Sequence, residues 1–355
     1  MKLLFITSCF DAAGGGNVIA KRNFTVLENV LGKENVTKFV VTKSRFKICD
    51  ILYRLKKHYV GGLTLNNVSD IVRLSGDYDV IWIDGSFFGA LAKCLKEFGY
   101  KGRIVCFFHN IERNFTKVTW RNLFAYPIKI RPIYKAEHDA IFSSDDIVTL
   151  TPRDMNFVKE TNKFAQIHIL PSSLNDNFRE LPLDTNFSKV FTLLFVGSYF
   201  YANVHGIEWF IANVLPFVEA KLIVVGAGME KLKYTPSSKL EIHGFVEDLG
   251  YYYRNCDVVV APIFEGSGMK TKTAEALMWG KYVIGTKEAF CGFVNSDEWG
   301  VKCCTADDFI QQIKRISSAQ NDKFNRYSRK IFLEKYSLEK SERIIKSILN
   351  CNEKS

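Results

Sequence analysis

The chain has 355 residues, of which 47% are hydrophobic and 24% are charged, as in an ordinary soluble globular protein. Its net charge of +10 at pH 7 is modest, and the sequence contains no recognisable nucleic-acid-binding motif, so no nucleic acid partner is expected. No stretch reaches about 18 consecutive apolar residues, so no membrane-spanning helix is expected either.

The cysteines and the basic residues bear on the cellular location. The nine cysteines are scattered and form no Cys-x-x-Cys pair, which favours a reducing cytosol. Most of the excess positive charge lies in segments 33–57 and 113–135 of the N-terminal half, where Trp120, Phe124 and Tyr126 interleave with basic residues. This composition suits peripheral contact with an anionic membrane or a lipid-phosphate acceptor, and equally a basic face that is only solvated. We expect a cytoplasmic protein, with contact at the inner face of the cell membrane left open.

The first half of the chain alternates apolar strands with helices. Strands are predicted at 2–7, 38–42, 79–84, 103–108, 146–150 and 167–170, and helices at 66–74, 90–98, 133–142 and 152–160. The alternation predicts a parallel sheet covered by helices on both faces. Ligands bind beyond the carboxyl ends of the strands in such sheets, and His109 follows one of these ends.

A glycine-rich turn follows the first predicted strand. Gly14, Gly15 and Gly16 precede a helix that is expected to begin near Asn17, and such a turn lets backbone N–H groups approach an anion. The run is not G-x-G-x-x-G, and no acidic residue ends a second strand about 20 residues later, which disfavours a dinucleotide-dependent oxidoreductase. As a simple tight turn, these glycines would need no ligand.

The second half repeats the alternation. Strands are predicted at 192–196, 221–225, 240–246, 258–261 and 282–284, and helices at 203–213, 270–279, 306–316 and, as one long basic amphipathic helix, about 323–348. The chain is long enough for two domains, each with its own core. The predicted organisation is a first domain at 1–175, a second at 187–325 and a C-terminal helical segment at 326–355 that packs back toward the first domain.

The stretch 257–286 carries the strongest site prediction, because it combines a strand, a glycine-bearing loop, a helix and a second strand. Gly268 lets the backbone approach a ligand closely, and the start of the following helix attracts anions. Lys270 and Lys272 add positive charge, and Glu275 can accept hydrogen bonds from a sugar hydroxyl. A phosphate at one end and a hydroxyl-rich group at the other indicate a nucleotide sugar. The alternative is an ordinary turn whose charged residues form a solvated face.

The same stretch, DVVVAPIFEGSGMKTKTAEALMWGKYVIGT, resembles the signature of the retaining glycosyltransferases of family 4, the group 1 transferases. The resemblance implies the GT-B fold, an α/β architecture with two Rossmann-like domains facing across a cleft. That family usually has two acidic residues eight positions apart, the first contacting the donor sugar and the second the ribose. Glu275 matches the second, and Glu265, ten positions earlier, is the candidate for the first.

Further segments extend the resemblance. FFHNIER is similar to the family's H-N-x-E segment, which implies that His109 lies near the transferred sugar. The donor contacts that the resemblance implies are Gly15, Gly16, Gly197, Ser198, Gly244, Phe245, Val246, Gly268, Met269, Lys270, Lys272 and Glu275. Among them, Gly244 to Val246 would face the nucleobase, and the helix start at Gly268 to Lys270 would stabilise the leaving diphosphate. Many members also carry a Lys or Arg after the glycine at 197; aromatic residues stand there here, and Lys270 is the candidate to replace that charge.

The resemblance implies retaining transfer of a sugar from a UDP- or GDP-linked donor to a glycan or lipid-linked acceptor, in bacterial surface polysaccharide synthesis. No cofactor beyond the donor and no metal are expected, because the sequence has no D-x-D motif at the carboxyl end of a strand. Two alternatives stay open. A nucleotide-sugar epimerase would need acid and base carboxylates that are not identifiable, and a non-catalytic partner subunit would account for the irregular spacing of Glu265.

Overall fold

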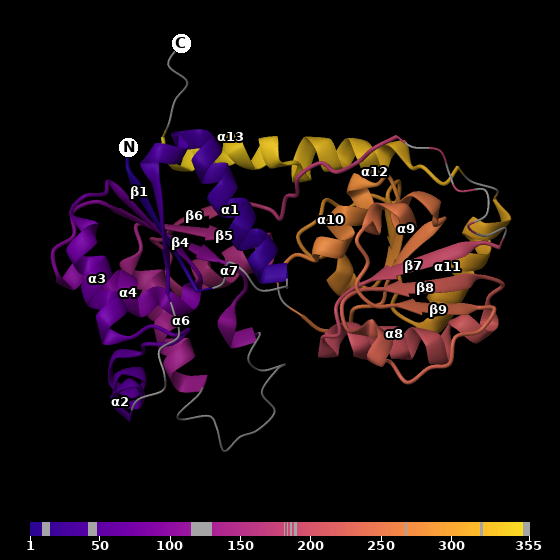
Figure 1. The fold of residues 1–355 in the computed structure, drawn as a ribbon, viewed down its shortest axis with the longest axis horizontal. Coiled ribbons are helices and arrows are strands. Elements are labelled where there is room, and N and C mark those ends of the chain that lie inside the picture. The colour runs from indigo at the N-terminus through magenta and orange to yellow at the C-terminus, as the bar shows by residue number, and fades with distance from the viewer. Residues whose placement is uncertain are drawn as a thin grey trace, which may run out of the picture. The chain divides into compact units, whose positions relative to one another are not determined.

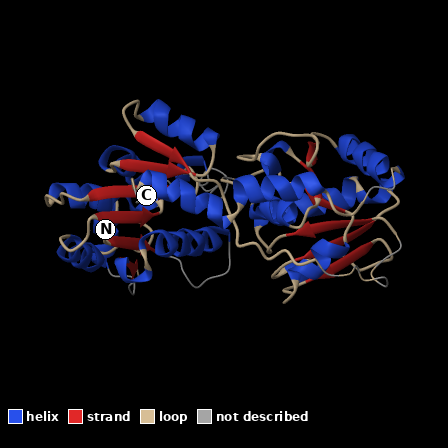
Figure 2. Cartoon of the chain, turned by 90° about the horizontal axis from the view of Figure 1, so that it is seen from above, coloured by secondary structure: helices blue, strands red, loops and turns tan. Residues whose placement is uncertain are grey.

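The computed structural model describes residues 1–8, 15–41, 48–114, 130–180, 182, 184, 187, 190–266, 268–319 and 322–350. Its contacts divide the chain into two compact units. Unit 1 comprises Met1–Pro171 and Ser341–Ser355, and unit 2 comprises Ser172–Lys340. Each unit is built on one six-stranded sheet with helices on both of its faces (Figures 1 and 2). This is the two-domain α/β architecture predicted from the sequence. Trp120, Phe124 and Tyr126 lie outside the described residues.

The sheet of unit 1 has the strand order β2-β1-β3-β4-β5-β6, and its neighbouring strands are parallel. The strands are β1 (Leu3–Thr7), β2 (Val36–Val40), β3 (Val80–Asp84), β4 (Arg103–Phe108), β5 (Asp146–Thr149) and β6 (Gln166–Ile169). The helices are α1 (Gly15–Leu31), α2 (Ile48–Lys57), α3 (Leu65–Ser75), α4 (Gly89–Glu97), α6 (Arg131–Ser143) and α7 (Pro152–Thr161). Strands β1 and β3 are buried along their whole length, as the continuous apolar runs of a doubly covered sheet require.

The sheet of unit 2 has the order β12-β11-β10-β7-β8-β9 and is also parallel. The strands are β7 (Thr192–Val196), β8 (Lys221–Val225), β9 (Leu240–His243), β10 (Val258–Ala261), β11 (Tyr282–Gly285) and β12 (Gly300–Lys302). The helices are α8 (Tyr201–Asn213), α9 (Leu249–Asn255), α10 (Thr271–Met278), α11 (Ala306–Ser318), α12 (Arg326–Ile331) and α13 (Leu338–Ile348), whose residues from Ser341 onward belong to unit 1. Strands β7 and β10 lie side by side, so the residues that follow them meet at one edge of the sheet.

Helix starts follow local capping chemistry. Thr64 and Asn67 form a reciprocal capping box at α3, and Thr305 and Asp308 form another at α11. At α7, the side chain of Thr151 caps the first turn, and a proline occupies the first helical position. These polar side chains cap the first turns of the three helices. The sequence predicted the start of each helix close to its capping residue.

Several element predictions are wrong in detail. The strand expected at 38–42 is β2, two residues earlier, and the strand expected at 240–246 ends at His243. Gly15 and Gly16 form the first turn of α1 instead of a loop before it. Helix α2 and strand β12 were not predicted.

The long terminal helix expected at about 323–348 is also wrong. It is divided into α12, a π-helical turn at Phe332–Tyr336, and α13. Ser337 has extended backbone and forms an isolated β-bridge with Leu174, whose N–H donates to the Tyr336 carbonyl at 3.0 Å. The hydroxyl of Tyr336 accepts a hydrogen bond from the N–H of Val294 at 2.8 Å. These tertiary hydrogen bonds replace the helical ones, which periodicity alone could not predict.

Candidate functional site

A buried lysine lies at the carboxyl ends of β7 and β10. The Nζ of Lys272 donates to Asn203 Oδ1 at 2.7 Å and lies 4.2 Å from the centre of the Phe195 ring. A Cβ placed on Gly197, the residue after β7, would lie 3.0 Å from this Nζ. The ammonium group of α10 is therefore held directly beside the glycine turn that follows β7.

Burial makes this lysine unusual. Lys272 is 9% exposed, and desolvation lowers its pKa to about 7, while Glu275 acts in the opposite direction and Lys270 adds to the lowering. An anion bound beside it would favour the charged ammonium form. Lys272 lies at the start of a helix and next to a glycine turn, and its charge can change near neutral pH. Such a cation is suited to binding phosphate.

The neighbouring Lys270 has different partners from those of Lys272. Its Nζ forms an ion pair with Glu288 Oε1 at 2.8 Å and donates to the carbonyl of Gly268 at 3.1 Å, so it closes the loop before α10 onto the segment after β11. Gly268 has φ of +63°, which favours glycine, and Ser267 lies outside the described residues. Met269 is buried, and its sulfur lies 3.1 Å from the N–H of Ser172. The cation adjacent to Gly197 is thus Lys272, and the suggestion that Lys270 replaces the charge expected after this glycine stays a prediction.

The turns after β7, β8 and β9 are fastened together. The N–H of Gly197 donates to the Val225 carbonyl at 2.9 Å, and Asn203 Nδ2 donates to the Ser198 carbonyl at 2.9 Å. The N–H of Gly226 lies 3.1 Å from the Gly244 carbonyl. Gly226 has φ of +151°, and a Cβ there would approach the Gly197 carbonyl to 2.0 Å, so this turn requires glycine.

These contacts join two predicted donor segments along one edge of the sheet. Gly197 and Ser198 follow β7, while Gly244, Phe245 and Val246 follow β9, and the Gly226 turn lies between them. Phe245 is 78% exposed, which leaves its ring available to a ligand. The Gly226 turn was not among the site residues predicted from the sequence, and its role in joining the two segments was missed.

Glu275 faces a cavity within unit 2. The hydroxyl of Tyr253 donates to its Oε2 at 3.1 Å, and burial raises its pKa to about 7 against the opposing effects of Tyr253 and Lys272. The cavity has a volume of about 440 Å³, and Asp248, Arg254 and Trp279 also line it. A carboxyl group that lines such a cavity can accept hydrogen bonds from a hydroxyl-bearing ligand or, when protonated, donate one to it. Glu265 lies partly exposed in the loop that follows β10, ten positions before Glu275.

His109 belongs to a buried polar cluster in unit 1. Its Nε2 lies 2.9 Å from Asp84 Oδ2, and Asn23 Nδ2 donates to the other Asp84 oxygen at 2.9 Å. Asp84, at the end of β3, has a fully buried side chain. The Phe107 ring packs edge-on against the imidazole at 4.9 Å. The sequence prediction missed Asp84, although an acidic residue ending the apolar run VIWID at a carboxyl strand end was a usable signal.

The backbone of Glu112, three residues after His109, is hydrogen-bonded to a second acidic residue. Its N–H donates to Glu137 Oε2 in α6. Burial raises the pKa of both carboxyl groups, and repulsion from Glu137 raises that of Glu112 further. This pair packs the segment after β4 against α6.

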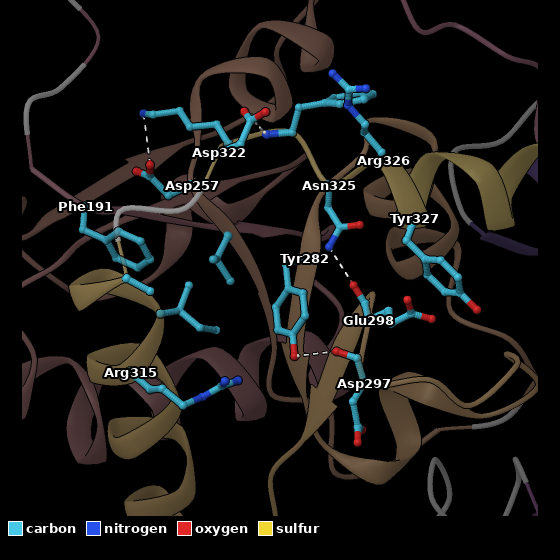
Figure 3. Close-up of a pocket in the computed structure, with 15 residues that line it drawn as sticks. Phe191, Asp257, Tyr282, Asp297, Glu298, Arg315, Asp322, Asn325, Arg326 and Tyr327 are labelled. Atoms are coloured by element: carbon cyan, nitrogen blue, oxygen red, sulfur yellow. Dashed lines mark hydrogen bonds and ion pairs between the residues drawn. The ribbon is translucent and has the colours of Figure 1, made fainter.

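A larger cavity of about 540 Å³ lies elsewhere in unit 2, at the amino ends of β10 and β11 (Figure 3). Tyr282 donates to the Asp297 carbonyl at 3.1 Å and Asn325 to the Glu298 carbonyl at 2.7 Å, as Figure 3 shows. None of the predicted site residues lines this cavity, and it lies at the end of the strands opposite to Lys272.

The described part of the chain contains no group of three or more histidines, cysteines or acidic residues that could hold a metal ion. None of its helices has both the length and the apolar character needed to cross a bilayer.

Comparison with known proteins agrees with this architecture. Residues 190–319 match the family model described as glycosyl transferases group 1. HepE of Anabaena, solved in complex with UDP, superposes with a TM-score of 0.72 at 14% identity, covering 99% of this chain and 100% of that one. The lipopolysaccharide outer core galactosyltransferase WaaB gives 0.67 at 14% identity over 99% and 100% of the two chains.

A glycosyltransferase from Rickettsia africae ESF-5 gives a TM-score of 0.65 at 15% identity and covers both chains completely. Comparison with curated protein sequences gives no match. At these identities the structural likeness shows the fold. The chain therefore has the GT-B fold, and its segment 190–319 matches the family model of the glycosyl transferases group 1.

Proposed function

We propose that the protein is a glycosyltransferase that moves a sugar from a nucleotide-sugar donor to an acceptor. The observation that carries the proposal is the buried Lys272, which meets the glycine turn after β7 at the start of α10. A leaving diphosphate bound there gains the lysine charge and the free N–H groups of the helix start. The family match of residues 190–319 supports the same activity.

The proposed donor is UDP-linked. The turn formed by Gly244 to Val246 would hold the base, and Glu275, which lines a cavity beside Tyr253, would hold the ribose hydroxyls. UDP and UDP-glucose are bound in the similarly folded HepE, which supports uridine over guanosine. No further cofactor and no metal take part in the proposal, because Lys272 supplies the charge that the departing diphosphate needs.

The proposed stereochemistry is retention at the anomeric carbon. Front-face transfer requires a stabilised leaving group and a positioned acceptor hydroxyl, and it requires no nucleophilic side chain. Glu265 is proposed to contact the donor sugar. The Nε2 of His109 lies 2.9 Å from Asp84 Oδ2, and its other ring nitrogen, Nδ1, is proposed to form a hydrogen bond with a sugar hydroxyl.

The proposed acceptor is a glycan or lipid-linked sugar at an anionic membrane, as in bacterial surface polysaccharide synthesis. Helix α2, which is labelled in Figure 1, supports this proposal. Its Leu52 and Leu55 are 53% and 41% exposed beside the exposed Lys56 and Lys57. After α2 the chain packs Gly61 against Phe87, which lies just beyond the carboxyl end of β3. The segment that follows α2 therefore lies near the edge of the sheet that carries Asp84.

Donor hydrolysis and thermal shift with a panel of UDP-, GDP- and ADP-sugars test the proposal. UDP-sugars are expected to raise the melting temperature and to be hydrolysed slowly, and Lys272→Met is expected to lose both effects. Lys330→Met removes a lysine that is 65% exposed in the same unit and should behave like the natural chain. Binding without any turnover would identify a non-catalytic partner subunit, and no response to any nucleotide would refute the donor site.

A further inference from the structure

Tyr253 is a buried tyrosine of α9 to which the proposed function assigns no role. It is 0% exposed, and it is among the residues that line the cavity of about 440 Å³ that Glu275 also lines. Its hydroxyl donates to Glu275 Oε2 at 3.1 Å. A buried tyrosine hydroxyl needs a hydrogen-bond partner, and here the partner is the side chain that is proposed to hold the ribose.

The ring of Tyr253 is held in place by Trp279, the residue that follows α10. The two rings are parallel, with 4° between their planes and 6.3 Å between their centres. On the same face of α9, three residues earlier, Gly250 leaves space for the indole, because a Cβ placed there would lie 2.5 Å from it. The guanidinium of Arg254 lies 5.5 Å from the centre of the same ring. These contacts fix the direction in which the Tyr253 hydroxyl points.

Helix α10 brings Glu275 to this hydroxyl. The N–H of Trp279 donates to the Glu275 carbonyl at 3.0 Å, so the indole that stacks on Tyr253 lies one helical turn from the carboxyl group that accepts its hydrogen bond. A glutamate side chain has several rotatable bonds and would otherwise populate several rotamers. The hydrogen bond selects an orientation in which Oε2 is engaged, while the second oxygen, Oε1, can accept a hydrogen bond from a ligand.

The hydrogen bond also acts on the charge of Glu275. Burial raises the pKa of this carboxyl group to about 7, and the hydrogen bond from Tyr253 opposes that rise. Without the hydroxyl, the neutral acid would be favoured further, and a neutral acid carries a hydrogen on one of its oxygens. The hydroxyl therefore favours the carboxylate, which is the form that accepts hydrogen bonds at both oxygens.

We propose that Tyr253 is a positioning residue for the nucleotide donor: by holding Glu275 Oε2, its hydroxyl aims Oε1 at a ribose hydroxyl and makes the site selective for ribonucleotides. This inference rests on the proposed function, because it requires the ribose to lie at Glu275. Tyr253 acts through Glu275 and touches no reacting atom. Its substitution is therefore expected to change donor binding and not the rate at which the bound donor reacts.

Calorimetric titration of the full chain with UDP, 2′-deoxy-UDP and 3′-deoxy-UDP tests this proposal. The natural chain is expected to bind at least one deoxynucleotide about 10- to 100-fold more weakly than UDP, because a site that hydrogen-bonds a hydroxyl rejects the analogue that lacks it. In Tyr253→Phe, which keeps the ring that stacks on Trp279, UDP is expected to bind about tenfold more weakly. The affinities for UDP and that deoxynucleotide should then differ by less than about threefold.

Tyr251→Phe is the matched control. Tyr251 lies on the same helix, and its hydroxyl also donates to a carboxylate oxygen, Asp184 Oδ2, at 2.6 Å. Of these two tyrosines, both in the described part of α9, only Tyr253 lines the cavity of Glu275. The control variant loses a comparable hydrogen bond and is expected to keep the natural affinity for each nucleotide. An equal loss of ribose discrimination in both variants would show a general effect on α9 and overturn the positioning role.

A second comparison applies if Tyr253→Phe does not fold because the Glu275 carboxylate has lost its partner. The double variant Tyr253→Phe, Glu275→Ala contains no such carboxylate. It is expected to bind UDP as Glu275→Ala does, since Tyr253 acts through Glu275 and the two substitutions then do not add. A further loss of UDP affinity in the double variant would overturn the proposal.

Donor kinetics supplies a readout that a packing role would not give. In Tyr253→Phe the donor KM is expected to rise by about tenfold with kcat within about twofold of the natural value, because the ribose contact is made equally before and during transfer. A fall in kcat with unchanged KM, or full ribose discrimination in a folded Tyr253→Phe protein, would contradict the proposal. Absence of UDP binding in the natural chain would instead refute the proposed donor site, so the two failures are distinguishable.

Discussion

Lys272 is the residue whose charge state is expected to depend most directly on a bound ligand. Burial lowers its pKa to about 7, so near neutral pH the side chain is divided between charged and neutral forms. In the proposed donor site, a bound diphosphate would stabilise the charged form and raise the pKa of the lysine in the complex. We therefore expect nucleotide binding and protonation of this lysine to be linked.

This linkage predicts a pH dependence of UDP affinity. Below the pKa of the free protein the lysine is charged both with and without ligand, so its contribution is complete. As the pH rises from about 7 to 9, the free protein loses the proton that binding requires, and the dissociation constant is expected to increase by about tenfold. Calorimetric titration in buffers of different ionisation enthalpy should detect proton uptake on binding, which Lys272→Met should abolish. A pH-independent dissociation constant in the natural chain would contradict this linkage.

Glu112 predicts a loss of folding stability as the pH rises. Burial raises its pKa in the folded chain, so the unfolded chain releases this proton first as the pH rises, and the fold loses stability until the pH passes the folded pKa. Glu112→Gln is expected to increase the free energy of unfolding by about 1–3 kcal/mol near pH 8 and to change it little near pH 4. Chemical denaturation at both pH values measures this difference. Glu160→Gln, on the exposed surface of α7, controls for the loss of one charge. An equal effect of Glu112→Gln at both pH values would contradict the raised pKa of the buried Glu112 carboxyl group.

At the scale of elements, the turns after β7, β8 and β9 act together. Gly226 has positive φ and lies against the Gly197 carbonyl, so both its conformation and its space exclude a side chain. A substitution there should disturb both the fold and the turn that is proposed to bind phosphate.

Gly226→Ala is expected to lower the free energy of unfolding by about 2–4 kcal/mol and to weaken UDP binding. Gly76→Ala is the matched control, because Gly76 has φ of −61° and a Cβ placed on it would have no atom within 4 Å. Chemical denaturation and UDP titration measure both effects. A Gly226→Ala variant as stable as Gly76→Ala would show that the turn tolerates a side chain and would contradict this account.

The elements also show what sequence patterns can and cannot predict. Apolar β-branched runs located β7, β8 and β10 at their observed bounds, because a doubly covered parallel sheet buries such runs completely. Helix α2 was missed although its apolar residues at 48, 51, 52 and 55 have helical spacing. The three-residue β12 is too short to have a period, and the break at Ser337 arises from contacts with Leu174 that are distant in sequence.

The same limit applies to the candidate sites. Lys272 and Glu275 were predicted as residue types on a helix after a glycine loop, and the structure adds their burial and their different neighbours. The partners that define their chemistry, Asn203 and Tyr253, lie 69 and 22 positions away. Asp84 and His109 lie 25 positions apart and meet because β3 and β4 are adjacent parallel strands that end at one edge. Spacing along the chain does not encode these contacts.

At the scale of the whole molecule, the chain would need to meet a membrane if its acceptor is lipid-linked. Helix α2 offers a short amphipathic surface for this contact, in which Leu52 and Leu55 enter the interface and Lys56 and Lys57 attract anionic headgroups.

Replacing both leucines by aspartate is expected to reduce binding to vesicles of mixed phosphatidylglycerol and phosphatidylcholine by about tenfold or more. Leu65→Asp, which changes a leucine that is 43% exposed at the start of α3, is expected to bind as the natural chain does. Vesicle co-sedimentation at low and high salt measures this difference. Equal binding of the double variant and the natural chain would remove α2 from any membrane contact.

The most direct test of the donor site is the crystal structure of the protein with UDP. We expect the diphosphate to lie within hydrogen-bonding distance of Lys272 Nζ, between the turn at Gly197 and the start of α10, with the ribose at Glu275. A nucleotide bound in the cavity at the amino ends of β10 and β11, or with its diphosphate away from Lys272, would contradict the proposed site.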